Sequence, residues 1–274
     1  MQQYKLLACD LDETTLTSDL RLSEGNIAAM KDALRAGKHI VFTTGRSILL
    51  TQPYIDLVPG MRYALTGTGA TGIDLVEKKD LFRTDIDDET IKWIMSAAAG
   101  FDILPFLFIG KDVLCPTWTA DRAEEFHVGK YADSYRKYLH PEGDPFPMFM
   151  ENPSPVEKIN LMFTNEMEKD MVYEQIQNLP VSFTSITPYV LEINANGVSK
   201  AQGLTRLCRH LGIDMSECIA VGDAENDMEL IRKAGLGLAV ENAQKEILEA
   251  ADAVVPSNDN DGVAEAINRY LLMK

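Results

Sequence analysis

The chain has few cysteines and no long apolar run, which excludes several classes of protein. Its four cysteines show no Cys-x-x-Cys spacing, so neither a zinc site nor a disulfide framework is expected. No apolar run approaches the ~20 residues that cross a bilayer. The first residues do not read as a signal peptide either, because Asp10 interrupts the apolar run almost at once. We therefore expect buried free thiols, a cytoplasmic location and no membrane partner.

Positive charge is also scarce. The 26 Lys and Arg residues are outnumbered by 42 Asp and Glu residues, which gives a formal net charge of −16. Nucleic-acid binding needs clustered cations to neutralise phosphates, so no nucleic-acid partner is expected. An anionic substrate would approach against this field. A site for such a substrate must therefore supply positive charge locally.

Length and composition are typical of a globular protein. The chain has 274 residues, of which 46% are hydrophobic and 25% are charged. A chain of this size buries roughly three quarters of its unfolded surface. The length suits one large or two medium domains. We expect a monomer or a weak homodimer.

Two carboxylates follow the first apolar segment. Asp10 and Asp12 come directly after Leu6–Cys9, which we expect to be a strand. An open α/β sheet binds ligands at the carboxyl edge of its strands, and both side chains point the same way if the strand is still extended there. Two acids can bind a divalent cation, or one can attack an electrophile while the other moves a proton. Alone, Asp-x-Asp is also typical of a solvated turn or a helix cap.

Three further segments each supply a group that phosphoryl transfer needs. They are Ile40–Arg46, Gly197–Lys200 and Ile219–Asp227. The first ends in hydroxyl, glycine and guanidinium groups that suit phosphate oxygens, the second offers an ammonium at a helix start, and the third ends in an acidic turn. Singly, Thr44 could cap a helix, Lys200 could be solvated and Asp223 could start a turn. Together with Asp10 and Asp12, in this order, the segments favour one shared site.

These motifs resemble those of the haloacid dehalogenase superfamily, specifically its Cof-type phosphatases of subclass IIB. Asp10-Leu-Asp-Glu-Thr is similar to the first family motif, and Thr44-Gly45-Arg46 to the second. Lys200 in Gly-Val-Ser-Lys resembles the third, and Gly-Asp223-Ala-Glu-Asn226-Asp227 the fourth. The tail around Asn242 and Asn258 also resembles this subclass. The resemblance covers both ends of the chain.

The resemblance implies an enzyme that hydrolyses small phosphomonoesters, expected to be sugar phosphates, through an aspartyl phosphate. It implies Asp10 as the nucleophile and Asp12 as the general acid and base. Mg²⁺ is the implied cofactor. Its ligands would come from Asp10, the backbone carbonyl of Asp12, Asp223 and Asp227. Groups implied to contact the substrate phosphate or its surroundings belong to Leu11, Thr44, Gly45, Arg46, Lys200 and Asn226.

Three positions depart from the family pattern. Glu13 stands where glycine is common, Thr68 where asparagine is common, and Ala201 where glycine often follows the lysine. None of these changes removes a catalytic group. Glu13 either takes part in substrate selection or points away from the metal. Arg46 either reaches the substrate or braces its loop by pairing with a carboxylate.

The order of expected elements divides the chain. Residues 5–80 alternate strand and helix, and the alternation resumes after Ser199, as in a doubly wound, Rossmann-like parallel sheet. Between them, local hairpins predict a mainly antiparallel α+β insertion. We expect a catalytic core of residues 1–83 and 189–274. Residues 84–188 would form an inserted cap domain that sets substrate specificity, as the subclass resemblance also implies.

Three other functions fit part of the pattern. A response-regulator receiver domain also places acids, Thr and Lys around Mg²⁺, but it lacks a 100-residue insertion and takes its phosphorylated Asp from a later strand. A phosphosugar mutase would need cations in the cap to bind a second phosphate, and the cap has few arginines, namely Arg122 and Arg136. A sugar-phosphate sensor without turnover would not need the complete catalytic set.

Overall fold

A computed structural model describes residues 3–274, apart from the side chains of residues 185 and 186. The chain divides into two compact units. The first comprises the chain up to Gly45, Thr51–Arg83 and Ser199–Lys274. The second comprises Arg46–Leu50 and Thr84–Val198. Among the described residues, no helix is long and apolar enough to cross a membrane.

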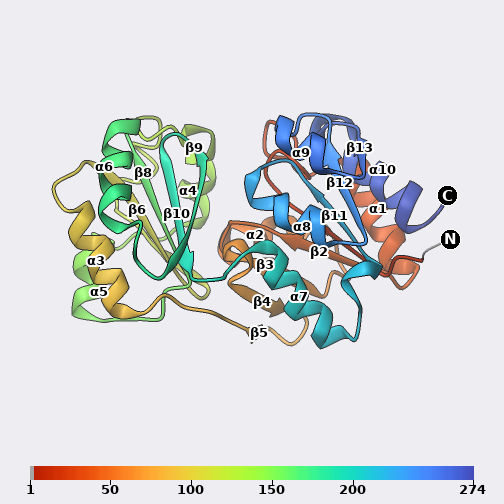
Figure 1. Cartoon of the computed structure of the whole chain (residues 1–274), viewed down its shortest axis with the longest axis horizontal. Coiled ribbons are helices and arrows are strands. Elements are labelled where there is room, and N and C mark those ends of the chain that lie inside the picture. Colours follow the sequence, from red (N-terminus) through yellow and green to blue (C-terminus); the bar gives the residue numbers. More distant parts are fainter. Residues whose placement is uncertain (1–2) are drawn as a thin grey trace. The chain divides into compact units, whose positions relative to one another are not determined.

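The first unit contains an eight-stranded sheet in the order β13-β12-β11-β1-β2-β3-β4-β5 (Figure 1). Strands β13 to β3 pair in parallel, whereas β4 and β5 are antiparallel additions at one edge. The expected doubly wound parallel sheet is therefore confirmed. The strands are β1 (Leu6–Cys9), β2 (His39–Thr43), β3 (Tyr63–Thr66), β4 (Thr71–Asp74), β5 (Lys79–Phe82), β11 (Cys218–Gly222), β12 (Leu236–Val240) and β13 (Ala253–Val255).

Helices bury the sheet of the first unit on both faces. Helix α7 lays Leu204 and Leu207 against Leu6 and Val41 of the sheet, and Leu230 of α8 joins the same core. Helices α1 and α10 contact each other, and each also contacts strands of the sheet. The α-helices are α1 (Glu24–Arg35), α2 (Ile48–Ile55, of which residues 48–50 belong to the second unit), α7 (Lys200–Leu211), α8 (Met228–Lys233), α9 (Lys245–Ala250) and α10 (Gly262–Ala266). Short helical turns are η1 (Gly67–Gly69), η3 (Met215–Glu217), η4 (Glu225–Asp227), η5 (Asn258–Asn260) and η6 (Ile267–Leu271).

The second unit is built on a five-stranded antiparallel sheet in the order β7-β6-β8-β10-β9. Its strands are β6 (Ile103–Ile109), β7 (Asp112–Leu114), β8 (Lys158–Phe163), β9 (Val181–Thr187) and β10 (Val190–Ala195). Its helices are α3 (Asp88–Ala98), η2 (Gly129–Tyr131), α4 (Ala132–Tyr138), α5 (Pro145–Glu151) and α6 (Glu166–Ile176). Residues Ile159 and Leu161 pack in one core with α3 and α6. Phe106 of β6 and Met162 of β8 pack in a second core with Tyr135 of α4.

The unit boundaries differ from the expected ones at two places. The second unit extends to Val198, beyond the expected end at residue 188, because β10 pairs with β8 and β9. Residues Arg46–Leu50 also belong to the second unit. Both differences come from long-range contacts that local periodicity does not report.

Helix α5 of the second unit is not among the elements expected from the sequence. Asp144 caps it by accepting a hydrogen bond from the Phe146 amide at 3.1 Å, and Pro145 occupies its first turn. An acid followed by proline is a known signal for a helix start, so the information was present in the sequence. The helix is short, and its mixture of proline, methionine and phenylalanine shows no clear period.

The Thr66–Ala70 segment forms a tight turn against α7. Gly67, Thr68 and Gly69 all have positive φ values, of 57°, 60° and 91°. A Cβ atom on Gly69 would lie only 2.4 Å from the Ser199 carbonyl oxygen. Glycine therefore lets this turn pack closely against the start of α7, where Lys200 is located.

Thr68 is a β-branched residue in the left-handed region, whereas asparagine tolerates that region well. We expect Thr68→Asn to raise the free energy of unfolding by about 1 kcal/mol through relief of backbone strain. Urea denaturation would measure the change. As a control, Thr205→Asn in the right-handed helix α7 should give no such gain. A destabilised Thr68→Asn variant would contradict the strain argument.

Candidate active site

Strand order brings three distant motifs to one edge of the parallel sheet. Strand β1 lies between β11 and β2, with Cys9 in register with Val221 and Phe42. The residues that directly follow these strands are therefore Asp10, Asp223 and Thr44. Strand order reverses direction next to β1, and ligands bind at such switch points in open α/β sheets.

The chain leaves the sheet directly after Asp10. The Asp10 amide still bonds to the Val221 carbonyl at 3.1 Å, but the amides of Thr15 and Leu16 both bond to the Leu11 carbonyl, at 3.0 and 2.8 Å. Asp12 thus lies in a turn. Because Asp12 is not in a strand, strand alternation does not make the side chains of Asp10 and Asp12 point the same way.

Three asparagines hold this turn from outside, and no role was expected for their side chains. Asn242 donates to the Glu13 carbonyl at 2.7 Å, and Asn258 donates to the Leu16 carbonyl at 2.9 Å. Asn26 donates to the Thr15 carbonyl at 3.1 Å. A single asparagine carries no local signal of such a contact, although two of the three lie in the tail that resembles the subclass.

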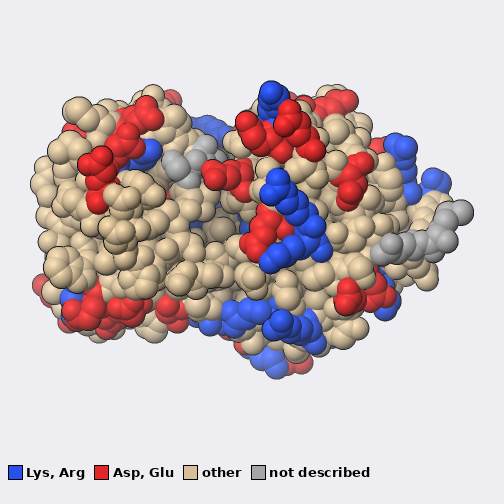
Figure 2. Space-filling model, viewed as in Figure 1, with Lys and Arg blue, Asp and Glu red and all other residues tan. Residues whose placement is uncertain are grey.

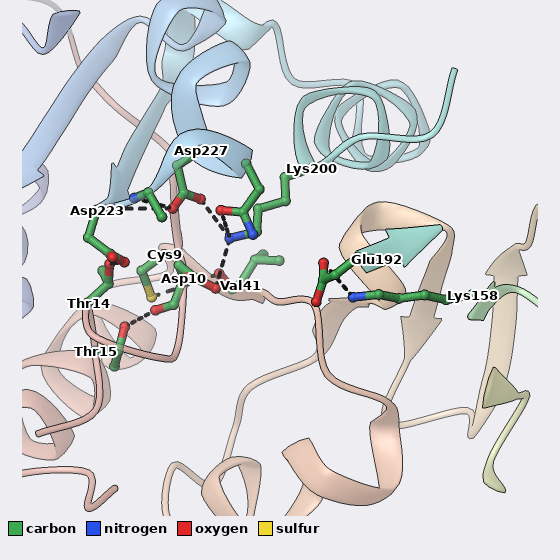
Figure 3. A network of polar contacts seen from close by, with 12 residues as sticks. Cys9, Asp10, Thr14, Thr15, Val41, Lys158, Glu192, Lys200, Asp223 and Asp227 are labelled. Carbon is green, nitrogen blue, oxygen red and sulfur yellow. Dashed lines mark hydrogen bonds and ion pairs between the residues drawn. The ribbon is translucent and has the colours of Figure 1, made fainter. Parts of the chain in front are cut away.

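Lys200 connects the motifs electrostatically. Ser199 caps α7 by accepting a hydrogen bond from the Gln202 amide at 3.2 Å, which places Lys200 in the first turn. Its ammonium lies 2.9 Å from Asp10 Oδ1 and 2.7 Å from Asp227 Oδ1 (Figure 3). It also donates to Asn226 Oδ1 at 3.3 Å. The Lys200 side chain is 0% exposed, so the solvated alternative is wrong.

The acidic turn after β11 is held by its own hydrogen bonds. Asp227 Oδ2 accepts from the amides of Asp223 and Ala224, at 3.2 and 3.4 Å. Asp223 Oδ1 accepts from the Thr14 hydroxyl at 2.6 Å. Gly222 permits this arrangement, because a Cβ atom there would lie 2.4 Å from the Asp227 side chain. Thr14 is a further residue of the site that the motifs alone did not single out.

The carboxylates of Asp10, Asp223 and Asp227 form a group suited to a metal ion. One oxygen from each lies within 4.8 Å of the others, and all three residues are buried. Three carboxylates face one buried ammonium, so negative charge is in excess. Carboxylate oxygens are the ligands that hard divalent cations prefer. The Asp12 carboxylate is not part of this group.

Burial and mutual repulsion shift the titration of the group. Burial raises the pKa of Asp10 well above its ordinary value, although Lys200 opposes the shift. Burial, followed by the charges of Asp227 and Glu13, raises the pKa of Asp223 to about 7. Burial alone would lower the pKa of Lys200, but Asp10 and Asp227 hold it above its ordinary value. The lysine thus stays charged, while the carboxylates bind protons or a cation.

Comparison with known proteins identifies the family. Residues 7–267 match the sequence profile of the haloacid dehalogenase-like hydrolases. The chain belongs to this family. The expected membership of the superfamily is therefore confirmed, and the protein is a hydrolase.

Relatives match the chain over nearly its full length. The 5-amino-6-(5-phospho-D-ribitylamino)uracil phosphatase of Bacillus subtilis (strain 168) is 26% identical over 275 residues, which cover 98% of this chain and 96% of that protein. A haloacid dehalogenase-like hydrolase from Bacteroides thetaiotaomicron has the same fold, with a TM-score of 0.85, 24% identity and coverage of 97% and 99% of the two chains. A subclass IIB sugar phosphatase superposes with a TM-score of 0.80 and 22% identity, over 97% and 98%.

The second family motif is divided between the two units. Thr44 is buried, its amide bonds to the Leu65 carbonyl at 3.0 Å, and its carbonyl accepts from the Thr68 amide at 2.9 Å. Arg46 lies in the second unit, where it donates to the Leu50 carbonyl at 3.4 Å. Its guanidinium lies 5.5 Å from the centre of the Tyr131 ring. Arg46 thus packs within the second unit, and a contact with substrate remains a prediction.

The backbone explains why glycine is common in the family at the position of Glu13. Glu13 has φ 54°, a left-handed conformation that glycine adopts without strain. Its side chain is half-buried, and its charge contributes to the raised pKa of Asp223. The departure from glycine therefore costs backbone strain and adds negative charge near the carboxylates of Asp10, Asp223 and Asp227.

Raised carboxyl pKa values make the metal-free protein pH-sensitive. Its folded state binds more protons than the unfolded chain between the ordinary and the raised pKa values, so stability falls as pH rises. In EDTA, we expect the free energy of unfolding of the wild type to fall with rising pH more than that of Asp223→Asn. Between about pH 5 and about pH 7.5, the difference between the two proteins should change by about 2 kcal/mol in favour of the variant. Thermal unfolding would measure this.

Mg²⁺ should restore the stability of the wild type at neutral pH and leave Asp223→Asn almost unchanged. Asp121→Asn, which changes an exposed carboxylate of the second unit, should keep the wild-type pH dependence. Equal stabilisation of Asp223→Asn and the wild type by Mg²⁺ would show that Asp223 is not a metal ligand.

Proposed function

We propose that this hydrolase is a Mg²⁺-dependent phosphatase of small phosphomonoesters, with sugar phosphates as its substrates. The observation that carries the proposal is the buried Lys200 ammonium, which lies within 3 Å of both Asp10 and Asp227 at the carboxyl edge of the sheet. This arrangement offers a carboxylate nucleophile beside fixed positive charge. A phosphoryl group needs both.

Asp10 and Asp12 would divide the reaction into two steps. An Asp10 carboxylate oxygen attacks phosphorus and forms an aspartyl phosphate, while Asp12 gives a proton to the departing alcohol. Asp12 then takes a proton from water, which attacks the aspartyl phosphate and releases inorganic phosphate. The turn position of Asp12, two residues beyond Asp10, suits a group that serves the leaving oxygen and then the water.

The remaining groups would hold the metal and the phosphate. Asp10, Asp223 and Asp227 would hold Mg²⁺ together with the backbone carbonyl of Asp12, and the ion would offset negative charge on the transferring phosphoryl group. Lys200 would neutralise phosphate oxygens, and Asn226 would orient its ammonium, to which it already bonds. Further phosphate donors would be Thr44, Arg46 and the amides of Leu11 and Gly45.

The net negative charge of the chain explains why the site needs local positive charge. Figure 2 shows both acidic and basic side chains on one face of the molecule, and over the whole chain the acidic residues are in excess, with a net charge of −16. A phosphate ester would approach against that field. The buried lysine and the metal would then attract the phosphate within the site itself.

The relatives support a phosphorylated polyol as substrate. The Bacillus subtilis relative is named for a substrate with a phosphorylated ribityl chain, and one protein of the same fold is described as a sugar phosphatase. A hydroxylated carbon chain that ends in a phosphomonoester is common to both descriptions. We take this chemistry, without the particular molecule, as the substrate class.

We further propose that the second unit acts as a cap domain and selects the substrate. Its sheet contains a buried ion pair between Lys158 and Glu192, with Nζ and Oε2 2.8 Å apart and side chains 0% and 8% exposed (Figure 3). Asn160 and Asn194 lie opposite these residues on the paired strands. Such a polar group inside a largely apolar unit suits recognition of hydroxyl groups.

Mutase activity receives no support from the arginines of the second unit. Arg122 pairs with Asp102 and Glu125 at 2.6 and 2.7 Å, and Arg136 pairs with Asp133 at 3.1 Å. These guanidinium groups are already engaged by carboxylates of their own unit. Seating a second substrate phosphate on them would require breaking those pairs.

Substitution of the two acids would test the mechanism. Asp10→Asn should lower turnover more than about a thousandfold, since an amide is not a nucleophile. Asp12→Asn should slow the first turnover of a sugar phosphate at least about tenfold more than that of p-nitrophenyl phosphate, whose leaving group needs no proton. Rapid-quench assays with Mg²⁺, and with EDTA as the metal-free control, would measure both. Equal slowing of the two substrates would contradict the acid role of Asp12.

Glu13 offers a test of substrate recognition. Glu13→Gln removes its charge, whereas Glu13→Gly also removes the left-handed backbone strain. We expect both variants to shift the kcat/KM ratio between the best sugar phosphate and p-nitrophenyl phosphate roughly threefold to tenfold. Only Glu13→Gly should gain stability. Identical ratios in all three proteins would show that Glu13 takes no part in recognition.

A further inference from the structure

Two thiols of the first unit lie in contact, away from the carboxylate group. Cys208 belongs to α7, and Cys218 is the first residue of β11. Their Sγ atoms are 3.4 Å apart. Both cysteines are free, and their residues are 2% and 0% exposed. Neither residue belongs to the four motifs of the site.

The pair lies in the core but directly beneath the surface. Its neighbours Leu204, Leu207 and Leu230 belong to the same apolar cluster. The connecting residues 209–217, by contrast, are exposed or half-buried throughout. Local opening of one short surface segment would therefore admit a small reagent to both sulfurs without unfolding the unit.

Backbone contacts of this segment hold the sulfurs together. The Ile213 amide bonds to the Cys208 carbonyl at 3.0 Å, and Gly212 ends α7 with φ 65°. The Cys218 thiol donates to the Asp214 carbonyl at 3.6 Å. Both cysteines are thus fixed by the same turn, and their contact involves none of the carboxylates of Asp10, Asp223 and Asp227.

The two thiols are not equivalent. The hydrogen bond with Cys218 lowers the pKa of Cys208, and the same contact raises the pKa of Cys218. Burial raises the pKa of Cys9 to about 12 and that of Cys115 to about 11. Because the thiolate is the reactive form, Cys208 is the cysteine of these four best suited to react first.

We propose that Cys208 and Cys218 are a redox modification site, at which a peroxide converts the two thiols to a reversible intramolecular disulfide. The Cys208 sulfur attacks one peroxide oxygen, the O–O bond breaks, and a sulfenic acid and water form. The Cys218 sulfur then attacks the sulfenic sulfur, the S–O bond breaks, and a second water leaves. The two thiols lose two electrons and two protons, and a small dithiol reverses the reaction.

The new bond would join two elements that carry the candidate active site. Helix α7 begins with Lys200, and β11 ends just before Asp223. Closing the sulfurs from 3.4 Å to about 2.05 Å is a small shift. It occurs about 12 Å along α7 from Lys200, given the rise of an α-helix. We therefore expect the disulfide to stabilise the unit by closing the loop, to preserve activity, and to protect Cys208 from further oxidation.

Thiol counting on the native protein would test the site. Wild-type protein would be treated with hydrogen peroxide, unfolded, alkylated with N-ethylmaleimide and weighed by mass spectrometry. Of the four cysteines, two should escape alkylation, and peptide mapping should show a Cys208–Cys218 link that dithiothreitol removes. The treated protein should unfold at a higher temperature and run as a monomer on a non-reducing gel.

Matched variants separate this site from general oxidation. Cys208→Ser and Cys218→Ser should each give no linked peptide and no gain in thermal stability, whereas Cys115→Ser should behave as the wild type. Four alkylated cysteines after an exposure that fully oxidises glutathione would overturn the proposal. A link through Cys9 or Cys115, or a sulfinic acid on Cys208 without a link, would overturn it as well. The wild-type peptide map decides the question even if a serine variant fails to fold.

Discussion

The contact of the Lys200 ammonium with Asp10 and Asp227 is the interaction on which the site depends. A buried cation is costly unless carboxylates surround it, and buried carboxylates are costly unless cations do. Here Lys200 pairs with two of the three carboxylates in the group, so the group keeps an excess of negative charge. Burial, together with that excess, raises the pKa values of Asp10 and Asp223, and such a group suits a divalent cation.

Such a group exists only because rigid parts of the first unit hold it in place. Gly69 and Gly203 let the Gly67–Gly69 turn approach α7, and a Cβ on Gly203 would lie 2.8 Å from the Gly69 backbone. Asn26, Asn242 and Asn258 fix the turn after Asp10 from three other parts of the chain. Each of these residues acts on the site through backbone position. Their importance is therefore geometric, and none needs to touch the substrate.

Two departures from the family pattern occur at positions with the same backbone conformation. Glu13 and Thr68 both occupy left-handed backbone, with φ values of 54° and 60°. Glycine and asparagine are the residues that adopt this conformation at least cost, which explains why the family favours them at these positions. The chain thus carries strain at both positions beside the candidate site. Strain of this kind persists only where the surrounding structure enforces it.

The sequence by itself determined the family and the parallel sheet, and it placed the acids, Thr44 and Lys200 at strand ends or a helix start. These predictions succeed because motif spacing and strand periodicity are local properties, and parallel strands bring their carboxyl ends to one edge. The assignment of Arg46–Leu50 and β10 to the second unit, the turn at Asp12 and the contact of Cys208 with Cys218 were decided by the tertiary structure alone. Each depends on pairing or packing between residues distant along the chain, and neither composition nor periodicity encodes which distant partner a residue meets.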